Sequence, residues 1–116
     1  MARIGVLLVV LVALLPACSG SSVPAFCGVT DEARVAISNV PPEQYPAAAA
    51  AQVDAVRAAA EELSGDQGEL ARKVADDLEA ASKATAGTVE FTEAYNAFVA
   101  DSNEFNHAYC NEPEVD

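Results

Sequence analysis

Aromatic residues recur at helical spacing near the C-terminal end of this 116-residue chain. Steps of four and three residues place a row of side chains on one face of an α-helix, and the row here is Phe91, Tyr95, Phe98, Ser102, Phe105 and Tyr109. A strand alternates its faces every second residue, so this spacing does not fit a strand. Five of the seven aromatic residues lie in this row, which we call the aromatic stripe. The sequence therefore predicts one aromatic helix that ends near Cys110.

The first helix of the domain is expected to be short. Thr30 can act as its N-cap because acidic residues follow in the first turn. Pro41 and Pro42 then prevent the helix from continuing. These signals predict a helix over residues 31–40, with three apolar positions turned inward: Ala33, Ile37 and Val40.

Two longer helices are expected between the first helix and the aromatic one. Pro46 suits the first position of a helix over residues 47–63, whose apolar stripe is Ala49, Val53, Val56, Ala60 and Leu63. The next helix spans residues 69–86, and its stripe is Leu70, Val74, Leu78, Ala81 and Thr85. Gly87 is suited to end it, and Thr88 to begin the aromatic helix.

These elements predict an all-α fold, because no segment has the pattern of a strand. We expect a small up-and-down bundle of three long helices plus a short first helix. The chain contains 25 alanines and few large apolar side chains after position 18. Large rings facing alanines would fill such a thin core, and a disulfide would add needed stability.

The charge of the chain is strongly negative. It has 18 acidic and 6 basic residues, a formal net charge of −12. Most bases follow an acid by three or four residues, which predicts ion pairs within helices: Asp31 with Arg34, Asp54 with Arg57, Glu69 with Arg72 and Lys73, and Glu79 with Lys83. The adjacent acids Glu61-Glu62 and Asp76-Asp77 are expected on solvated faces. With no basic patch left over, nucleic acid is not an expected partner.

The N-terminal segment has the pattern of an export signal. Arg3 precedes 12 uncharged residues, 4–15, a run too short to span a bilayer as a helix. The sequence Leu15-Pro16-Ala17-Cys18 that ends this run resembles a bacterial lipobox. An ordinary signal peptide, cleaved after Ala17 or Ala25, is the alternative.

The resemblance implies a lipoprotein whose residues 1–17 are removed and whose Cys18 carries diacylglycerol and a further acyl chain such as palmitate. It places the protein at the extracytoplasmic face of the cell membrane, held there by lipid. The Ala-rich, Lys-poor composition suggests an actinobacterial source. Residues 18–29 would then form a lipidated cysteine and flexible tether, and residues 30–116 an acidic helical-bundle domain.

The cysteine count agrees with this interpretation. There are three cysteines, and an exported protein with an odd number has one to spare. If Cys18 takes the lipid, Cys27 and Cys110 remain to form a disulfide that closes a ring of 110 − 27 + 1 = 84 residues. The alternatives are two free thiols or a zinc site that includes His107.

Motifs for catalysis are not found in the sequence. His107 is the only histidine, and no phosphate-binding loop, His-x-x-x-His pair or calcium loop is present. We therefore predict a non-enzymatic binding or scaffold module of the cell envelope, without a metal or cofactor. Its partner would be an envelope protein or a small apolar ligand.

The aromatic stripe leaves three interpretations open. It can be the core of the bundle, or an apolar groove for a ligand or a partner helix. It can also hold haem, because Tyr and His both ligate haem iron. Tyr95, His107 and Tyr109 lie on or beside the stripe, so a carrier of haem or lipid is the alternative function.

Overall fold

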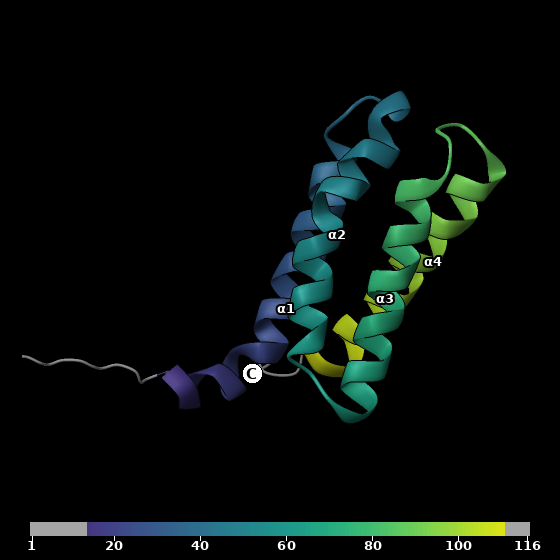
Figure 1. Cartoon of the computed structure of the whole chain (residues 1–116). Helices are drawn as coiled ribbons and strands as arrows, with labels where there is room; N and C mark the ends of the chain where they lie inside the picture. The colour runs from purple at the N-terminus through teal and green to yellow at the C-terminus, as the bar shows by residue number, and fades with distance from the viewer. Residues whose placement is uncertain (1–13, 111–116) are drawn as a thin grey trace, which may run out of the picture.

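The computed structural model describes the backbone of residues 14–110 and the side chains of residues 22–110. Its helices are α1 (Leu14–Ser38), α2 (Tyr45–Glu61), α3 (Gly65–Lys83) and α4 (Val89–Phe105). The short 3₁₀ turn η2 (Pro42–Gln44) precedes α2, and the π-helical turn η3 (Asn106–Cys110) continues α4. The helices run alternately up and down (Figure 1), and residues 14–110 contain no strand. The prediction of a small all-α bundle is confirmed.

Helix α1 is not short, as the sequence analysis had expected, but the longest of the four with 25 residues. Thr30 is not its N-cap: it is buried inside the helix and donates a hydrogen bond to the backbone oxygen of Cys27 (3.0 Å). The expectation of a flexible tether over residues 18–29 is also wrong, because their backbone is helical. The physical reason is that Phe26, fully buried, extends the apolar face of the helix one turn before Thr30.

The predicted signal peptide, residues 1–17, falls largely outside the described part of the chain, since residues 1–13 are not described. The backbone of Cys18 belongs to α1. Figure 1 shows the first turns of α1 leaving the axis of the remaining helix. Pro24 lies inside α1 and cannot donate to the carbonyl four residues earlier, which accounts for a bend in this region.

Helix α3 begins at Gly65, four residues before the expected start. Three residues, 62–64, separate it from α2, and the left-handed backbone of Gly65 (φ 62°) completes the turn into α3. Gly68, which falls between the two expected helices, is instead buried in the first turns of α3. A Cβ at this position would lie 2.6 Å from the backbone oxygen of Leu63, so glycine lets the α2–α3 connection approach closely.

The connection between α3 and α4 agrees only in part with its prediction. Helix α3 ends at Lys83 rather than at residue 86, and Gly87, expected to end the helix, lies in the turn beyond it with a left-handed backbone (φ 81°). Thr88 is the N-cap of α4, and its hydroxyl accepts a hydrogen bond from the backbone N–H of Phe91 (3.2 Å).

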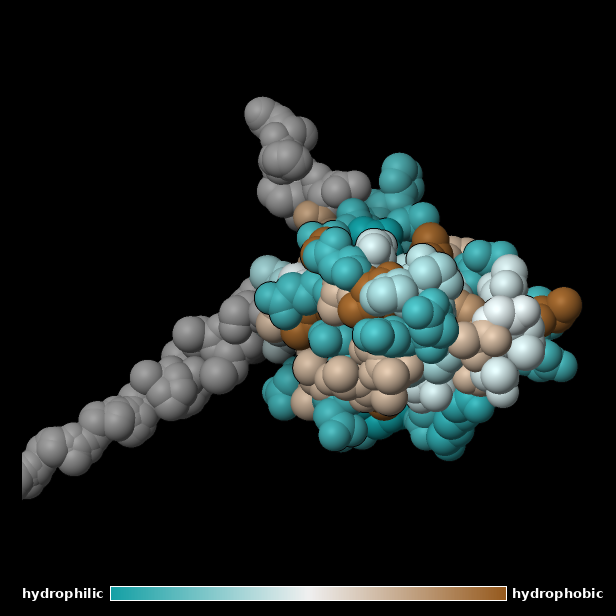
Figure 2. All heavy atoms as spheres, turned by 90° about the horizontal axis from the view of Figure 1, so that it is seen from above, coloured by the Kyte–Doolittle hydropathy of each residue, from teal (hydrophilic) through white to brown (hydrophobic). Residues whose placement is uncertain are grey.

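The core consists of large rings set among alanines. Phe26, Phe98 and Phe105 are almost completely buried. Around them lie alanines with no exposed surface: Ala33, Ala49, Ala60, Ala71, Ala75 and Ala81. Helix α3 packs extensively against both α2 and α4, whereas α1 packs mainly against α2. The view in Figure 2, onto the end that carries the α1–α2 and α3–α4 connections, shows mostly polar surface with small, separate apolar areas.

Ion pairs differ in part from those expected along single helices. Arg34 pairs with Asp31, and Lys83 with Glu79, as predicted. Arg57 instead reaches from α2 to Asp76 (3.0 Å) and Glu79 (2.6 Å) on α3. In the same way, Lys73 reaches from α3 to α4 rather than to a neighbour on its own helix. Arg57 and Lys73 thus connect neighbouring helices. Each ion pair contributes modestly to stability, because at least one of its side chains remains in contact with solvent.

Candidate functional site

The predicted disulfide is present between Cys27 and Cys110, whose Cα atoms lie 6.1 Å apart. Cys27 is on α1 and Cys110 ends η3, so the bond ties the last turn of the aromatic helix to the first helix. Because both sulfurs are bonded to each other, the alternatives of free thiols and of thiolate zinc ligands are wrong. No group of three or more His, Cys, Asp or Glu residues in the described part of the chain is arranged to hold a metal ion.

The aromatic stripe is largely core. Phe91, Phe98, Ser102 and Phe105 are buried, while Tyr95 and Tyr109 are half-buried. Its rings form two clusters. In the first cluster Tyr45 stacks on Phe91 with ring centroids 5.9 Å apart. Phe91 in turn stacks on Tyr95, and Tyr95 contacts Phe98. Near the disulfide, Phe105 lies between Phe26 (4.6 Å) and Tyr109 (4.9 Å).

The three residues considered as haem ligands are not gathered into one site. Tyr95 lies in the first ring cluster, where burial raises the pKa of its hydroxyl. Tyr109 is 14 residues further along, about 21 Å at the rise of an α-helix. His107 is exposed. Tyr109 lines a pocket to which Tyr95 does not contribute.

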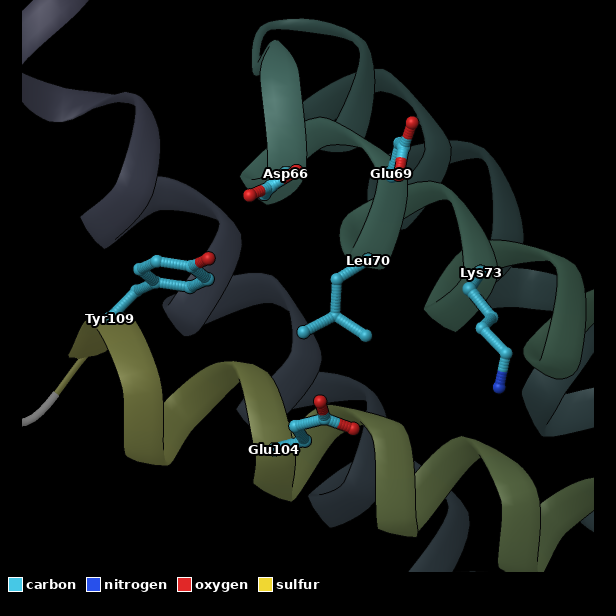
Figure 3. Close-up of a pocket in the computed structure, with 6 residues that line it drawn as sticks. All are labelled: Asp66, Glu69, Leu70, Lys73, Glu104 and Tyr109. Atoms are coloured by element: carbon cyan, nitrogen blue, oxygen red, sulfur yellow. The ribbon is translucent and has the colours of Figure 1, made fainter.

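That pocket lies between the first turns of α3 and the end of α4, and has a volume of about 330 Å³. Its walls are Asp66, Glu69, Leu70 and Lys73 from α3, Glu104 from α4 and Tyr109 from η3. In Figure 3 the Leu70 side chain occupies the centre, with the Tyr109 ring to its left, Lys73 to its right and the Glu104 carboxylate below it. The sequence analysis did not find this pocket, because it depends on how two distant helix ends meet.

A pair of carboxyl groups lies beside the pocket, between α3 and α4. Burial, followed by the hydrogen bond and the charge of Asp101, raises the pKa of Asp77 to about 7. The hydrogen bond from Asp77 holds the pKa of Asp101 below its ordinary value, and Lys73, whose Nζ lies 2.7 Å from Asp101 Oδ2, acts in the same direction. At acidic and near-neutral pH the pair therefore shares one proton, carried by Asp77.

The expectation of a solvated face for Asp76-Asp77 is thus wrong for Asp77. Its Oδ2 is buried, as is the hydroxyl of Ser102, and neither has a hydrogen-bond partner in the described part of the structure. Asp77 immediately precedes the buried Leu78 and follows Val74 by three residues, so it lies at the edge of the apolar stripe. Asp101 holds the corresponding place beside Ser102 on α4.

Comparison with protein-family models, with curated protein sequences and with solved structures finds no match to this chain. Among the described helices, none combines the length and the apolar character that crossing a membrane requires.

Proposed function

We propose that this protein is a lipid-anchored lipoprotein of the bacterial cell envelope, with Cys18 as the lipidated residue. The observation that carries the proposal is that Cys18 is the one cysteine left over once Cys27 and Cys110 are joined. It also closely follows an uncharged apolar run, residues 4–15, of the length found in secretory signals. A disulfide requires an oxidising compartment, which supports export.

The domain that the lipid holds would act by binding rather than by catalysis. Its single histidine is exposed, and its surface is acidic. Two acyl chains on one cysteine suffice for stable membrane attachment, so the acidic body needs no affinity of its own for anionic lipids. Its partners would be met at the extracytoplasmic face, where another envelope protein or a small ligand can reach the bundle.

The alternative, a carrier that holds haem or lipid along the aromatic stripe, has less support. Phe98 and Phe105 have almost no exposed surface, because alanines and neighbouring aromatic rings pack around them. Tyr95 and Tyr109 lie at different levels of the helix and so could not serve one haem iron.

Membrane partitioning of the full chain tests the anchor. The parent protein, expressed in a bacterium with lipoprotein processing, is expected in the membrane fraction, with an intact mass that corresponds to a lipid-modified chain beginning at Cys18. Cys18→Ser is expected to lose the lipid mass and to leave the membrane fraction or remain as uncleaved precursor. Ser21→Ala is the matched control, because it changes a neighbouring small residue and keeps the acceptor thiol.

An unlipidated parent chain in the medium would contradict the proposal. So would a Cys18→Ser variant that carries the same lipid mass as the parent. The disulfide serves as an internal check on folding in both cases, since a correctly oxidised domain is lighter by two hydrogens whichever way Cys18 is processed.

A further inference from the structure

The pocket between α3, the end of α4 and η3 does not involve Cys18, so a role for it is independent of the lipid anchor. It is formed by two parts of the chain that the disulfide end of the bundle brings together, the start of α3 and the last turns of α4 and η3. Its volume of about 330 Å³ is at the small end of the range of ligand pockets. A compact molecule, not an extended one, would fit it.

The charge around the pocket favours a cation. Asp66, Glu69 and Glu104 line it, and none of the three forms an ion pair with another described residue. Lys73 is the single basic residue in the lining, and its ammonium group is held by Asp101 on α4. Figure 3 shows the Lys73 side chain directed away from Asp66 and Tyr109. Asp66 and Glu69 are therefore not neutralised by the protein itself, while Glu104 lies within electrostatic reach of the Lys73 ammonium group.

The remaining walls distinguish an organic cation from a hydrated inorganic one. The side chain of Leu70 stands in the middle of the pocket and offers hydrocarbon rather than oxygen ligands. Tyr109 adds an aromatic ring, which is held in place by packing on Phe105 (4.9 Å) and by the adjacent Cys110 disulfide. Aromatic rings attract ammonium groups, and quaternary ammonium ions in particular.

From this combination of cavity, unpaired carboxylates, leucine and anchored tyrosine, we propose that the pocket binds a small organic ammonium ion. The carboxylates of Asp66 and Glu104 attract its charge from opposite sides, and Leu70 and Tyr109 contact its alkyl part. Glu69 lies at the rim and contributes only through its charge. The ring of Tyr109 makes the site selective for ammonium groups that carry carbon over bare cations of the same charge.

Titration of the purified, disulfide-bonded full chain with choline, followed by amide NMR shifts, tests this proposal. We expect saturable shifts centred on Leu70, Glu104 and Tyr109, with a dissociation constant in the millimolar range. The neutral isostere 3,3-dimethylbutan-1-ol and sodium ion at the same concentration are expected to give no saturable shifts at these residues.

Two variants separate the roles of charge and ring. Glu104→Gln, an exposed change, is expected to weaken choline binding severalfold without altering the fold. Tyr109→Leu is expected to weaken choline binding about 2- to 5-fold, whereas Tyr109→Phe retains it. Asp54→Asn on α2, outside the pocket, is the control for the loss of one negative charge and is expected to bind choline as the parent does.

The proposal is overturned if choline and sodium ion give the same shifts, because the chain would then act only as a diffuse acidic surface. It is also overturned if Glu104→Gln, with an unchanged amide spectrum in the absence of choline, binds choline as tightly as the parent. Neither result depends on Cys18, so the failure of this proposal and the failure of the lipid anchor are distinguishable.

Discussion

Replacing Asp77 by Asn is expected to remove the loss of folding stability that the Asp77 carboxyl, between α3 and α4, causes as the pH rises. Asn has nearly the same shape as Asp, and its amide can donate to Asp101 as protonated Asp77 does. In the parent, Asp77 has a folded-state pKa of about 7 against an ordinary value of 3.8. The folded chain therefore binds this proton more tightly than the unfolded chain, and folding stability falls as the pH rises from about 4 through 7.

The magnitude follows from the size of this window. Between about pH 5 and pH 7 the folded chain keeps a proton that the unfolded chain has lost, at ~1.36 kcal/mol for each pH unit. Over these two pH units the free energy of unfolding of the parent would fall by about 3 kcal/mol. Because Asp77 is partly accessible to solvent and shares its proton with Asp101, we expect a smaller loss of about 1–3 kcal/mol. Asp101 behaves oppositely, since its lowered pKa contributes stability that is lost only as the pH falls below about 4.

Urea unfolding followed by far-UV circular dichroism, at about pH 5 and about pH 8, measures the effect. The stability of Asp77→Asn relative to the parent is expected to be greater by about 1–3 kcal/mol at about pH 8 than at about pH 5, because the folded parent holds its extra proton over most of this interval. Asp54→Asn is the control, because this exposed carboxylate on α2 makes no ion pair with a described residue. It reports the general benefit of removing one charge from a chain of net charge −12. An identical difference between Asp77→Asn and the parent at both pH values would refute the reasoning.

Two further predictions concern stability. Loop-closure entropy for the 84-residue ring (110 − 27 + 1) predicts that the disulfide stabilises the fold by about 4.5 kcal/mol. The Cys27→Ser/Cys110→Ser chain is therefore expected to unfold at a much lower urea concentration, with Cys18→Ser as the control. An unchanged urea midpoint would contradict this prediction. Gly68→Ala is expected to lower the free energy of unfolding by about 1–3 kcal/mol, because its Cβ would meet the backbone of Leu63. Gly28→Ala is expected to raise it by about 0.5–1 kcal/mol, because a Cβ at this exposed position of α1 has nothing within 4 Å. Equal urea midpoints for these two glycine variants would show that the close approach at Gly68 is not a constraint.

The parts of the fold that could be predicted are those set by neighbours in the sequence. Spacing of four and three residues identified the buried face of α4, and Thr88 was identified as its cap from its place after Gly87. The pairing of Cys27 with Cys110 followed from a count of cysteines once Cys18 was set aside. None of these depends on the distance between helices.

The start of α1 was missed because a local signal competed with a longer one. Thr30 followed by two acids is a good N-cap sequence, and it predicts a helix start in the middle of an apolar row that continues before it. Counting back from Ile37 in steps of four and three leads through Ala33 and Thr30 to Phe26. The burial of Phe26 against Phe105 outweighs a single cap, because a fully buried aromatic ring stabilises by roughly 2–3 kcal/mol and a cap by about 1.

The acid pair and the pocket could not be predicted from any one helix, because both lie where the edges of two helices meet. A residue next to an apolar stripe is turned by about 100° from it, which leaves it solvated on an isolated helix but enclosed when a neighbour packs on that side. Asp77 and Asp101 are such edge residues, and only the packing of α3 on α4 turns them into a proton-sharing pair. Lys73 holds one carboxyl of this pair while its stem lines the pocket. The charge that Lys73 presents to a bound cation thus depends on how firmly Asp101 retains it, so the chemistry of this region is a property of the helix–helix contact.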